Sequence, residues 1–369
     1  MVLVSCTLFS VLAANTPFSK SYLAFWHQTA GLSFSPFQLG FTLTHWINDG
    51  LMSVFFLLVG LEIKREFYQG ELSGVRKALL PAVAAAGGMI LPASIHFLFN
   101  RGTPTAHGFG IPMATDIAFA LAVLSLLGNR VPPSLKVFLT ALAIIDDLGA
   151  ILVIALFYTR DISLMYLGCS LGLFAGLLAM QRLNVTRLAV YLITGVLMWY
   201  CMVRSGIHPT IAGVLLAFAI PPGRDDAPSP SSRLQHMLHA PVAFFILPVF
   251  ALANTGIRFA QDWHLSLLER NSLGILSGLV AGKPIGIVLF SVGAVASGLC
   301  TLPDETGWRG LTGAGLLAGI GFTMSIFVAN LAFNDEHLVN NSVMAVLASS
   351  VIAGLGGFLF LTAGGRRAK

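Results

Sequence analysis

The chain has 369 residues, of which 56% are hydrophobic and only 10% are charged, and its formal net charge is +5. So few charges among so many apolar residues are typical of a polytopic membrane protein and exclude a soluble globular one. The Lys and Arg excess lies in connecting segments, as expected of topology signals, so we expect no nucleic-acid partner.

The four cysteines lie in or beside separate apolar runs and show no Cys-x-x-Cys spacing. We interpret them as core residues rather than as metal ligands or disulfide partners. No cofactor is expected. No polar connection is long enough to form a separate catalytic domain, so we expect the activity to lie within the membrane.

Residues 1–14 form an apolar stretch that is short for a membrane span. Because a basic start is missing, we interpret this stretch as a first helix lacking a turn rather than as a signal peptide. Residues 15–41 are aromatic and polar, and we expect them to form an outer loop at the membrane interface.

Further apolar runs bring the number of expected membrane segments to twelve, which places both termini on the inner side. These runs are 44–63, 79–99, 106–128, 135–158, 162–180, 186–203, 206–220, 240–256, 272–297, 310–333 and 339–363. With this topology, fourteen of the 21 Lys and Arg residues lie inside, six lie outside and one, Lys283, lies within the membrane. The positive-inside rule supports this orientation.

The longest polar connection, Pro221 to His239, is rich in Pro, Ser and charge. We predict one transmembrane transporter domain over 1–369. It consists of eight segments in 1–220, a flexible inner-side linker at 221–239 and four segments in 240–369.

Two neighbouring carboxylates, Asp146 and Asp147, stand near the middle of the run 135–158. A carboxylate at that depth costs at least ~2.5 kcal/mol and is a functional candidate by default. Neighbouring positions on a helix point in different directions, so the two side chains can serve different partners. Burial disfavours the charged form and a nearby cation favours it, so such an acid can exchange a proton for a cation.

Lys283 stands between Gly282 and Pro284, where the helix loses a hydrogen-bond donor. We expect it to pair by preference with Asp146, which leaves Asp147 as the freer ion ligand. A purely structural Asp–Lys pair inside a helix bundle is the alternative that these residues leave open.

Two of the runs are interrupted by glycines. The fourth contains Gly108, Gly110 and Pro112 before Thr115 and Asp116, and the eleventh contains glycines at 313, 315, 319 and 321. Broken helices at membrane depth expose dipole ends, and Asp116 could neutralise their N-termini. Glycine used only for close helix packing is the alternative.

Other polar residues stand at the ends of runs. Asp49 and Glu62 lie at the two ends of the second run, and Glu66 follows in a cluster with Lys64 and Arg65. His208 opens the eighth run, while His236 and His239 precede the ninth on the inner side. Histidines near acids can respond to pH between about 5 and 8, although an interfacial filling role suits each of them equally well.

Several stretches closely resemble the bacterial NhaA sodium/proton antiporters, in that family's order, from about residue 44 to the C-terminus. They are Trp46-Ile-Asn-Asp-Gly-Leu-Met-Ser-Val-Phe-Phe-Leu-Leu-Val-Gly-Leu-Glu62, Ala114-Thr-Asp-Ile-Ala-Phe-Ala120, Ala141-Leu-Ala-Ile-Ile-Asp-Asp-Leu-Gly149, Gly282-Lys-Pro284 and Gly319-Ile-Gly-Phe-Thr-Met-Ser-Ile326.

The resemblance implies an all-α polytopic membrane protein with twelve transmembrane helices, inverted repeats and two discontinuous crossing helices, 4 and 11. It implies ion and proton binding at Asp146 and Asp147, with Thr115, Asp116 and Lys283 in support. Glu62, Glu66, His208 and His236 match positions linked to pH response. Apart from the resemblance, we expect Asp49 to be an entry or accessory acid. Residue 235 is Gln where the best-known member's pattern has Glu, so the pH midpoint is left open.

We therefore expect an electrogenic, pH-regulated antiporter that extrudes Na⁺ or Li⁺ in exchange for external H⁺ across the bacterial inner membrane. A homodimer is implied by the resemblance alone. The alternatives are an intramembrane aspartyl protease, which needs two carboxylates facing one another from different helices, and a channel or a carrier of another solute.

Overall fold

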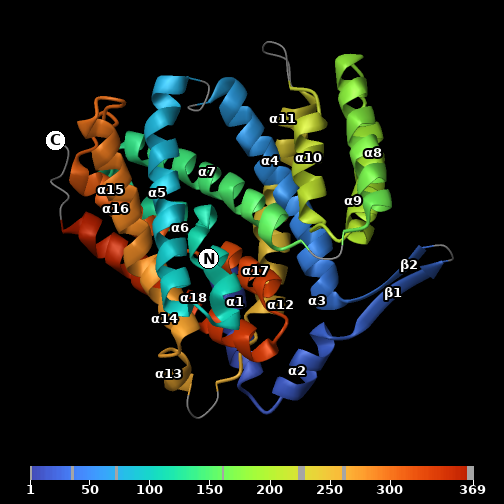
Figure 1. Ribbon diagram of the computed structural model, residues 1–369, viewed down its shortest axis with the longest axis horizontal. Helices are drawn as coiled ribbons and strands as arrows, with labels where there is room; N and C mark the ends of the chain where they lie inside the picture. Colours follow the sequence, from blue (N-terminus) through green and yellow to red (C-terminus); the bar gives the residue numbers. More distant parts are fainter. Residues whose placement is uncertain are drawn as a thin grey trace. The chain divides into compact units, whose positions relative to one another are not determined.

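The computed structural model describes residues 2–34, 37–70, 74–159, 162–222, 229–259 and 263–363 and is helical apart from a two-stranded hairpin (Figure 1). The chain divides into two compact units. Unit 1 comprises Met1–Arg65 and Ala155–Phe259, and unit 2 comprises Glu66–Ile154 and Ala260–Lys369. The unit boundaries fall inside helices α4 and α7.

Unit 1 contains the N-terminal elements and the helices from the middle of the chain. They are α1 Val2–Ala14, α2 Ser19–Trp26, β1 Thr29–Phe34, β2 Phe37–Thr42, α3 Leu43–His45, the π-helical turn η1 Trp46–Leu51, most of α4 Met52–Gln69, α8 Leu164–Arg182, α9 Leu188–Ser205, α10 Thr210–Ala219, α11 Pro230–Pro241, the π-helical turn η5 Val242–Ile246 and α12 Leu247–Asn254.

The outer loop predicted for residues 15–41 is in fact ordered into α2 and the antiparallel hairpin β1–β2. Thr29 pairs with Thr42 and Gly31 with Gly40, and the indole Nε1 of Trp46 donates to the Ala30 carbonyl at 2.7 Å. Strand pairing gives these backbone groups hydrogen-bond partners within the chain, where an open loop would leave them to water. The local sequence pattern did not predict this pairing.

Small residues and one lysine join α4 to α10. A Cβ atom added at Gly60 would lie 2.7 Å from the Ala217 Cβ, and one at Gly213 would collide with the Ser53 carbonyl oxygen. Lys64, counted in the sequence among the inner-side charges, is only 2% exposed. Its Nζ donates to the carbonyls of Ala217, Phe218 and Ile220 and so caps the C-terminus of α10.

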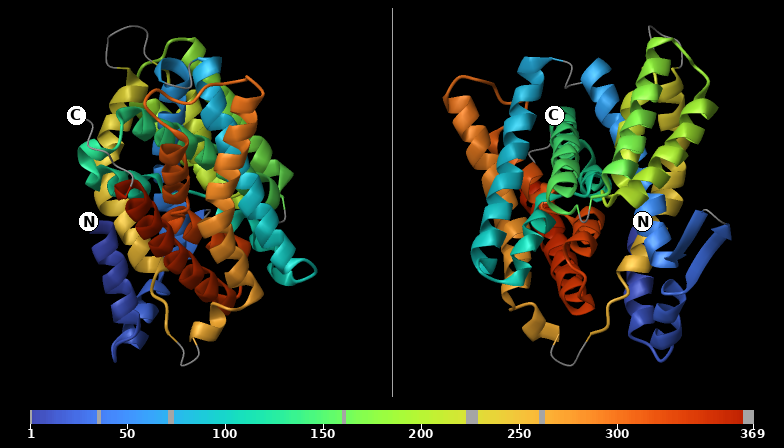
Figure 2. Two further views of the ribbon diagram at one scale, coloured as in Figure 1. Left: turned by 90° about the vertical axis from the view of Figure 1, so that its left-hand side faces the viewer. Right: turned by 45° about the vertical axis from the view of Figure 1, so that its right-hand side comes forward.

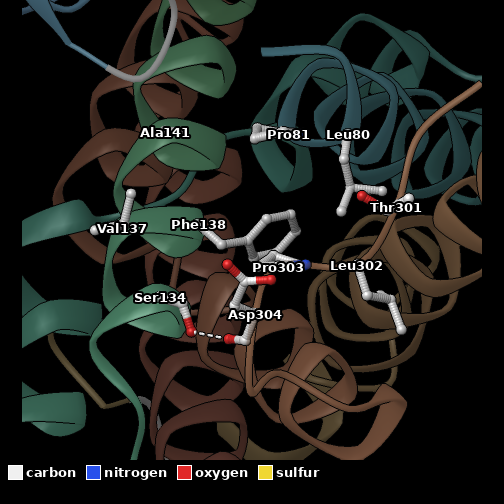
Figure 3. Close-up of a pocket in the computed structure, with 10 residues that line it drawn as sticks. All are labelled: Leu80, Pro81, Ser134, Val137, Phe138, Ala141, Thr301, Leu302, Pro303 and Asp304. Atoms are coloured by element: carbon white, nitrogen blue, oxygen red, sulfur yellow. Dashed lines mark hydrogen bonds between the residues drawn. The ribbon is translucent and has the colours of Figure 1, made fainter. Parts of the chain in front are cut away.

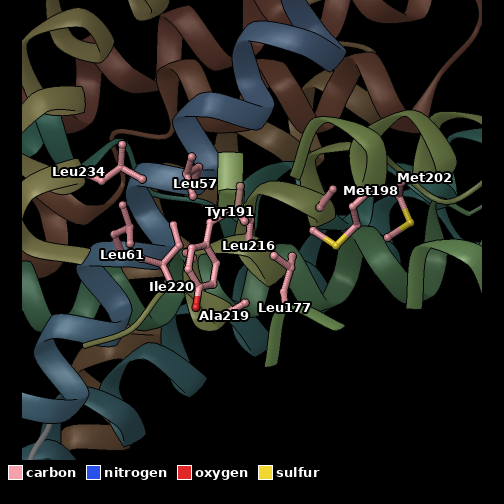
Figure 4. Packing of buried hydrophobic residues seen from close by; sticks show 12 residues of the cluster. Leu57, Leu61, Leu177, Tyr191, Met198, Met202, Leu216, Ala219, Ile220 and Leu234 are labelled. Carbon is pink, nitrogen blue, oxygen red and sulfur yellow. The ribbon is translucent and has the colours of Figure 1, made fainter. Parts of the chain in front are cut away.

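An apolar cluster around this contact forms the core of unit 1 (Figure 4). It draws side chains from α4, α8, α9, α10 and α11, with Tyr191 and Leu61 fully buried at its centre. The Tyr191 hydroxyl donates to the Val185 carbonyl at 3.0 Å, so its polar end is satisfied.

Part of the linker predicted at 221–239 is helical. Helix α11 begins at Pro230, and the Ser229 hydroxyl caps it by accepting from the Ser232 N–H at 2.9 Å. Ser before Pro at the first helical position is a strong start signal. Residues 223–228 of the predicted linker lie outside the described residues.

Unit 2 contains the last turn of α4 and the elements that carry the predicted site. They are α5 Val75–Asn100, the 3₁₀ helix η3 Pro104–Met113, α6 Ile117–Leu126, the 3₁₀ turn η4 Gly128–Arg130, α7 Pro133–Phe157, α13 Trp263–Ser266, α14 Arg270–Ser277, the π-helical turn η6 Gly278–Gly282, α15 Lys283–Ala296, α16 Trp308–Ala318, α17 Phe322–Ala332 and α18 Glu336–Thr362. Helices α5 and α15 lie side by side (Figures 1 and 2). Gly87 and Gly286 bring their backbones together, because a Cβ at either glycine would meet the other's carbonyl oxygen.

Both predicted helix interruptions are present in unit 2. η3 and α6 meet at a 42° bend, and α16 and α17 at a 45° bend. Among the described residues, eight helices are long and apolar enough to cross a membrane, or up to eleven if each bent pair counts as one span, and α10 is a shorter apolar helix. The chain is thus a multi-pass helical protein, and the count of twelve stays a prediction.

The contact between α4 and α10 yields a stability prediction. Gly213→Ala should destabilise the protein by about 1–3 kcal/mol, because the new methyl group collides with the Ser53 carbonyl of the neighbouring helix. The matched control is Gly172→Ala on α8, where an added Cβ has no atom within 4 Å among the described residues. Thermal unfolding in detergent checks both. An equal melting temperature for the two variants would contradict the close packing.

Candidate functional site

Two adjacent carboxylates are buried in the middle of α7. Asp146 is 0% exposed and Asp147 is 2% exposed. The surrounding Ala, Leu and Ile residues are good helix formers and suit a membrane interior, so the helix continues unbroken through both acids. Since the two are sequence neighbours on a helix, their side chains leave the axis in different directions.

Lys283 reaches Asp146 from α15. Its Nζ lies 2.8 Å from Asp146 Oδ2, and neither side chain is exposed. The expected pairing of Lys283 with Asp146 is therefore present. The lysine is the first residue of α15, directly after the π-helical turn η6, and its Nζ also donates to the Met113 carbonyl. A buried ion pair must recover a large desolvation cost, and these added hydrogen bonds help to do so.

Thr115 connects the ion pair to the two broken spans. Its hydroxyl oxygen lies 2.7 Å from Asp146 Oδ2 and 3.0 Å from the Ala318 carbonyl oxygen. A hydroxyl has one proton to donate, so it serves one of these acceptors at a time. A change of charge on Asp146 therefore alters the hydrogen bonding of the Ala318 carbonyl at the end of α16.

Asp116 caps two helices at once. Its Oδ1 accepts from the Phe119 N–H at 2.9 Å, at the start of α6. Its Oδ2 accepts from the Thr323 N–H at 3.2 Å and from the Thr323 hydroxyl at 2.5 Å, at the start of α17. The backbone closes the junction, since the Asp116 N–H donates to the Ile320 carbonyl at 2.7 Å. One carboxylate therefore meets the positive ends of two helices, as the sequence predicted from the breaks.

The chemistry open to Asp146 depends on the partners of its two carboxylate oxygens. Asp146 Oδ2 is committed to Lys283 and Thr115, whereas Asp146 Oδ1 accepts no hydrogen bond from the described residues. Carboxylate and carbonyl oxygens are the donors that hard cations prefer. Asp146 Oδ1 is thus an oxygen of the kind that a small cation or a proton can bind, and the two would compete for it.

A separate cavity of about 460 Å³ lies in unit 2 between the starts of α5 and α7 and the connection from α15 to α16 (Figure 3). Leu80, Phe138 and Pro303 line it, and the Asp304 side chain borders it. The Ser134 hydroxyl donates to the Asp304 carbonyl at 2.5 Å. Neither Asp146 nor any of its partners belongs to this lining.

The residues predicted to respond to pH come from α4, from the segment just before α10 and from α11. His208 lies with Asp49 in unit 1, where His208 Nε2 is 3.5 Å from Asp49 Oδ1. Glu62 and Glu66 are half-buried on α4. His236 is exposed on α11 next to the buried Gln235.

The sequence reasoning missed two participants in the site and, in unit 1, the burial of Lys64. Thr323 stands in the quoted motif Gly319–Ile326 but was assigned no contact. The Met113 carbonyl is visible only as the end of η3. The burial of Lys64 could have been found, because it continues the stripe of Leu57 and Leu61 on α4.

Comparisons with known proteins agree with this architecture. A family model described as "Na+/H+ antiporter 1" matches residues 1–361. Relatives named Na(+)/H(+) antiporter NhaA include one from Dechloromonas aromatica, 58% identical over 98% of this chain and 92% of its own length. Another from Flavobacterium psychrophilum is 55% identical over 98% and 92%. A third from Oleidesulfovibrio alaskensis is 44% identical over 98% and 90%. The chain therefore belongs to the NhaA family of Na⁺/H⁺ antiporters.

Proposed function

We propose that this protein exchanges Na⁺, and also Li⁺, for H⁺ at Asp146 and Asp147. The observation that carries the proposal is the fully buried pair of Asp146 with Lys283, 2.8 Å apart on α7 and α15. Burying charged groups in a membrane segment costs free energy, so such a pair is a functional candidate by default. The printed names of the family's members, antiporters of Na⁺ and H⁺, support the same reaction, which is transport and not enzymatic catalysis.

Competition at shared oxygens is enough to couple the two ions. Na⁺ arriving from inside takes oxygens of Asp147 and Asp146 and displaces a proton from Asp147. Lys283 loses its partner at the same time and releases a second proton. Two protons against one cation move net charge, so the exchange is electrogenic and responds to the membrane potential by about 2.3 kcal/mol per charge per 100 mV.

The proposed architecture is one transporter domain over 1–369 with twelve spans and two inverted repeats. The broken spans η3–α6 and α16–α17 are its crossing helices, and the contacts of Asp116 with α6 and α17 support this assignment. Alternating access re-exposes the loaded site to the outside. We place the protein as a homodimer in the bacterial inner membrane with both termini inside, where it serves salt tolerance and pH homeostasis.

Regulation by pH is part of the proposal. Protons occupy the carboxylates in acid and switch the exchange off. Glu62, Glu66, His208 and His236 tune the midpoint, and Asp49 is an accessory acid. Gln235, buried beside His236, replaces an acid of the family pattern, so the midpoint is a property to be measured for this chain.

A protease is disfavoured by the same contacts. Asp146 and Asp147 are neighbours on one helix, Asp146 is bound to Lys283, and Asp116 is committed to two helix N-termini. A shared-proton dyad needs two carboxylates facing one another without a nearby cation. A carrier of another solute is the remaining alternative and is separated by the transport assay below.

The first prediction concerns the two acids. In everted membrane vesicles that hold a proton gradient, Na⁺ should collapse the gradient in wild type, more strongly at alkaline pH. Asp147→Asn and Asp146→Asn should give no response, because each keeps the shape of the side chain and removes the charge that holds the cation. Dequenching of a pH-sensitive dye measures it. Asp304→Asn, an exposed acid beside the cavity of unit 2, is the control that should behave as wild type.

The second prediction concerns charge movement. Lys283→Ala and Lys283→Arg should both lose the Na⁺-induced current on a supported membrane. Arginine keeps the positive charge but cannot release a proton, so it separates proton transfer from simple charge compensation. A wild-type current in Lys283→Arg or in Lys283→Ala would rule out Lys283 as a proton carrier.

A further inference from the structure

Asp49 lies between two imidazole rings in unit 1. His45 Nε2 is 2.9 Å from Asp49 Oδ2, and His208 Nε2 is 3.5 Å from Asp49 Oδ1. The three side chains form a gradient of exposure, at 45%, 15% and 9% respectively. An unbroken row of proton-binding atoms therefore runs from solvent at His45 to the buried ring of His208.

The surroundings hold this row in place. His45 ends the short helix α3, which continues through η1 into α4 (Figure 1), and its ring stacks on Phe41 at 4.2 Å. The Asp49 carbonyl accepts from the Trp199 Nε1 at 3.0 Å. Beyond His208, its Nδ1 lies 2.7 Å from the Thr210 hydroxyl oxygen.

Two neighbouring helices contribute polar groups to the segment that carries Asp49. Helix α9 presents Trp199, and α12 presents Asn254, whose amide donates to the Asn48 side chain at 2.9 Å. The electrostatic interactions resolved for His45 and His208 are with Asp49 and with each other. The carboxylate is thus the natural acceptor for a proton that arrives on either ring.

We propose that His45, Asp49 and His208 form a proton-collecting relay at the outer end of unit 1. This proposal rests on the proposed function, and His45 is its new member. In the predicted topology, His45 lies at the outer end of the second run and His208 at the outer end of the eighth. The structure brings both side chains to Asp49.

The relay balances as follows. A hydronium ion protonates His45 at Nδ1, and the ring passes its Nε2 proton to Asp49 Oδ2. The carboxyl group then turns and gives this proton to His208 Nε2. The His208 ring keeps the proton as an imidazolium, whose Nδ1–H donates to the Thr210 hydroxyl oxygen. The 3.5 Å separation shortens during transfer, as catalytic hydrogen bonds commonly do. His45 and Asp49 end with the proton count with which they began, and His208 ends with one proton more.

The test uses purified protein in right-side-out proteoliposomes with the inner pH clamped and Na⁺ efflux followed while the outer pH is varied. His45→Gln should move the midpoint of the outer-pH dependence by roughly one unit or more toward acid, because glutamine cannot take up the proton that an imidazole takes up between about pH 5 and 8. His27→Gln should leave the midpoint unchanged. His27 is an exposed histidine of the same unit whose Nδ1 contacts the Leu23 carbonyl of its own helix.

The possible results separate the two proposals. If wild type shows no Na⁺-coupled proton movement, the proposed function fails. If wild type exchanges ions but His45→Gln keeps the wild-type midpoint, or shifts only with the inner pH, the relay is overturned.

Histidine ¹⁵N spectra provide a second readout that does not require His45→Gln to fold. In wild type, protonation of His45 should also shift the His208 resonances, and Asp49→Asn should abolish this dependence. Independent titration in wild type would overturn the relay.

Discussion

A lysine with no exposed surface in the middle of a membrane protein must be compensated, and the arrangement of unit 2 follows from that need. Asp146 supplies the opposite charge at 2.8 Å, and the Met113 carbonyl supplies a second acceptor. Removing either partner would leave a buried charge uncompensated in low-dielectric surroundings, which would destabilise the folded protein by several kcal/mol. The pair therefore ties α7, α15 and the end of η3 to one another.

The helix breaks make this compensation available. Because η3 ends at Met113, its carbonyl is released from helical hydrogen bonding and can accept from Lys283. The breaks also expose N–H groups at the starts of α6 and α17. Asp116 accepts from the Phe119 N–H, from the Thr323 N–H and from the Thr323 hydroxyl. Thr115 then links the junction to Asp146. Asp146 is thus hydrogen-bonded to the segment between η3 and α6, whose next residue, Asp116, caps α6 and α17.

Much of this site was predictable because charged residues within an apolar membrane segment are energetically costly and therefore rare. Asp146, Asp147 and Lys283 cannot be placed in loops, and the glycines around Asp116 mark the breaks; the structure places Lys283 on Asp146 and Asp116 at both helix starts. The roles of these residues in transport stay predictions.

Other features were not predictable because they depend on partners distant in the sequence. The hairpin β1–β2 replaces an expected loop, and α11 occupies part of an expected linker. Lys64 is buried because α10 presents its C-terminal carbonyls there. The contact of His45 with Asp49 is an i,i+4 pair, but its meaning appears only when His208 arrives from another helix.

The claim that Na⁺ and H⁺ compete for Asp146 and Asp147 is tested most directly by proton release. Na⁺ is added to purified, weakly buffered protein in detergent, and the solution pH is followed, with no membrane and no gradient. The account predicts acidification that saturates with Na⁺, is reproduced by Li⁺ and not by a large organic cation, and is absent in Asp147→Asn. Saturable Na⁺ binding without proton release in wild type would contradict it.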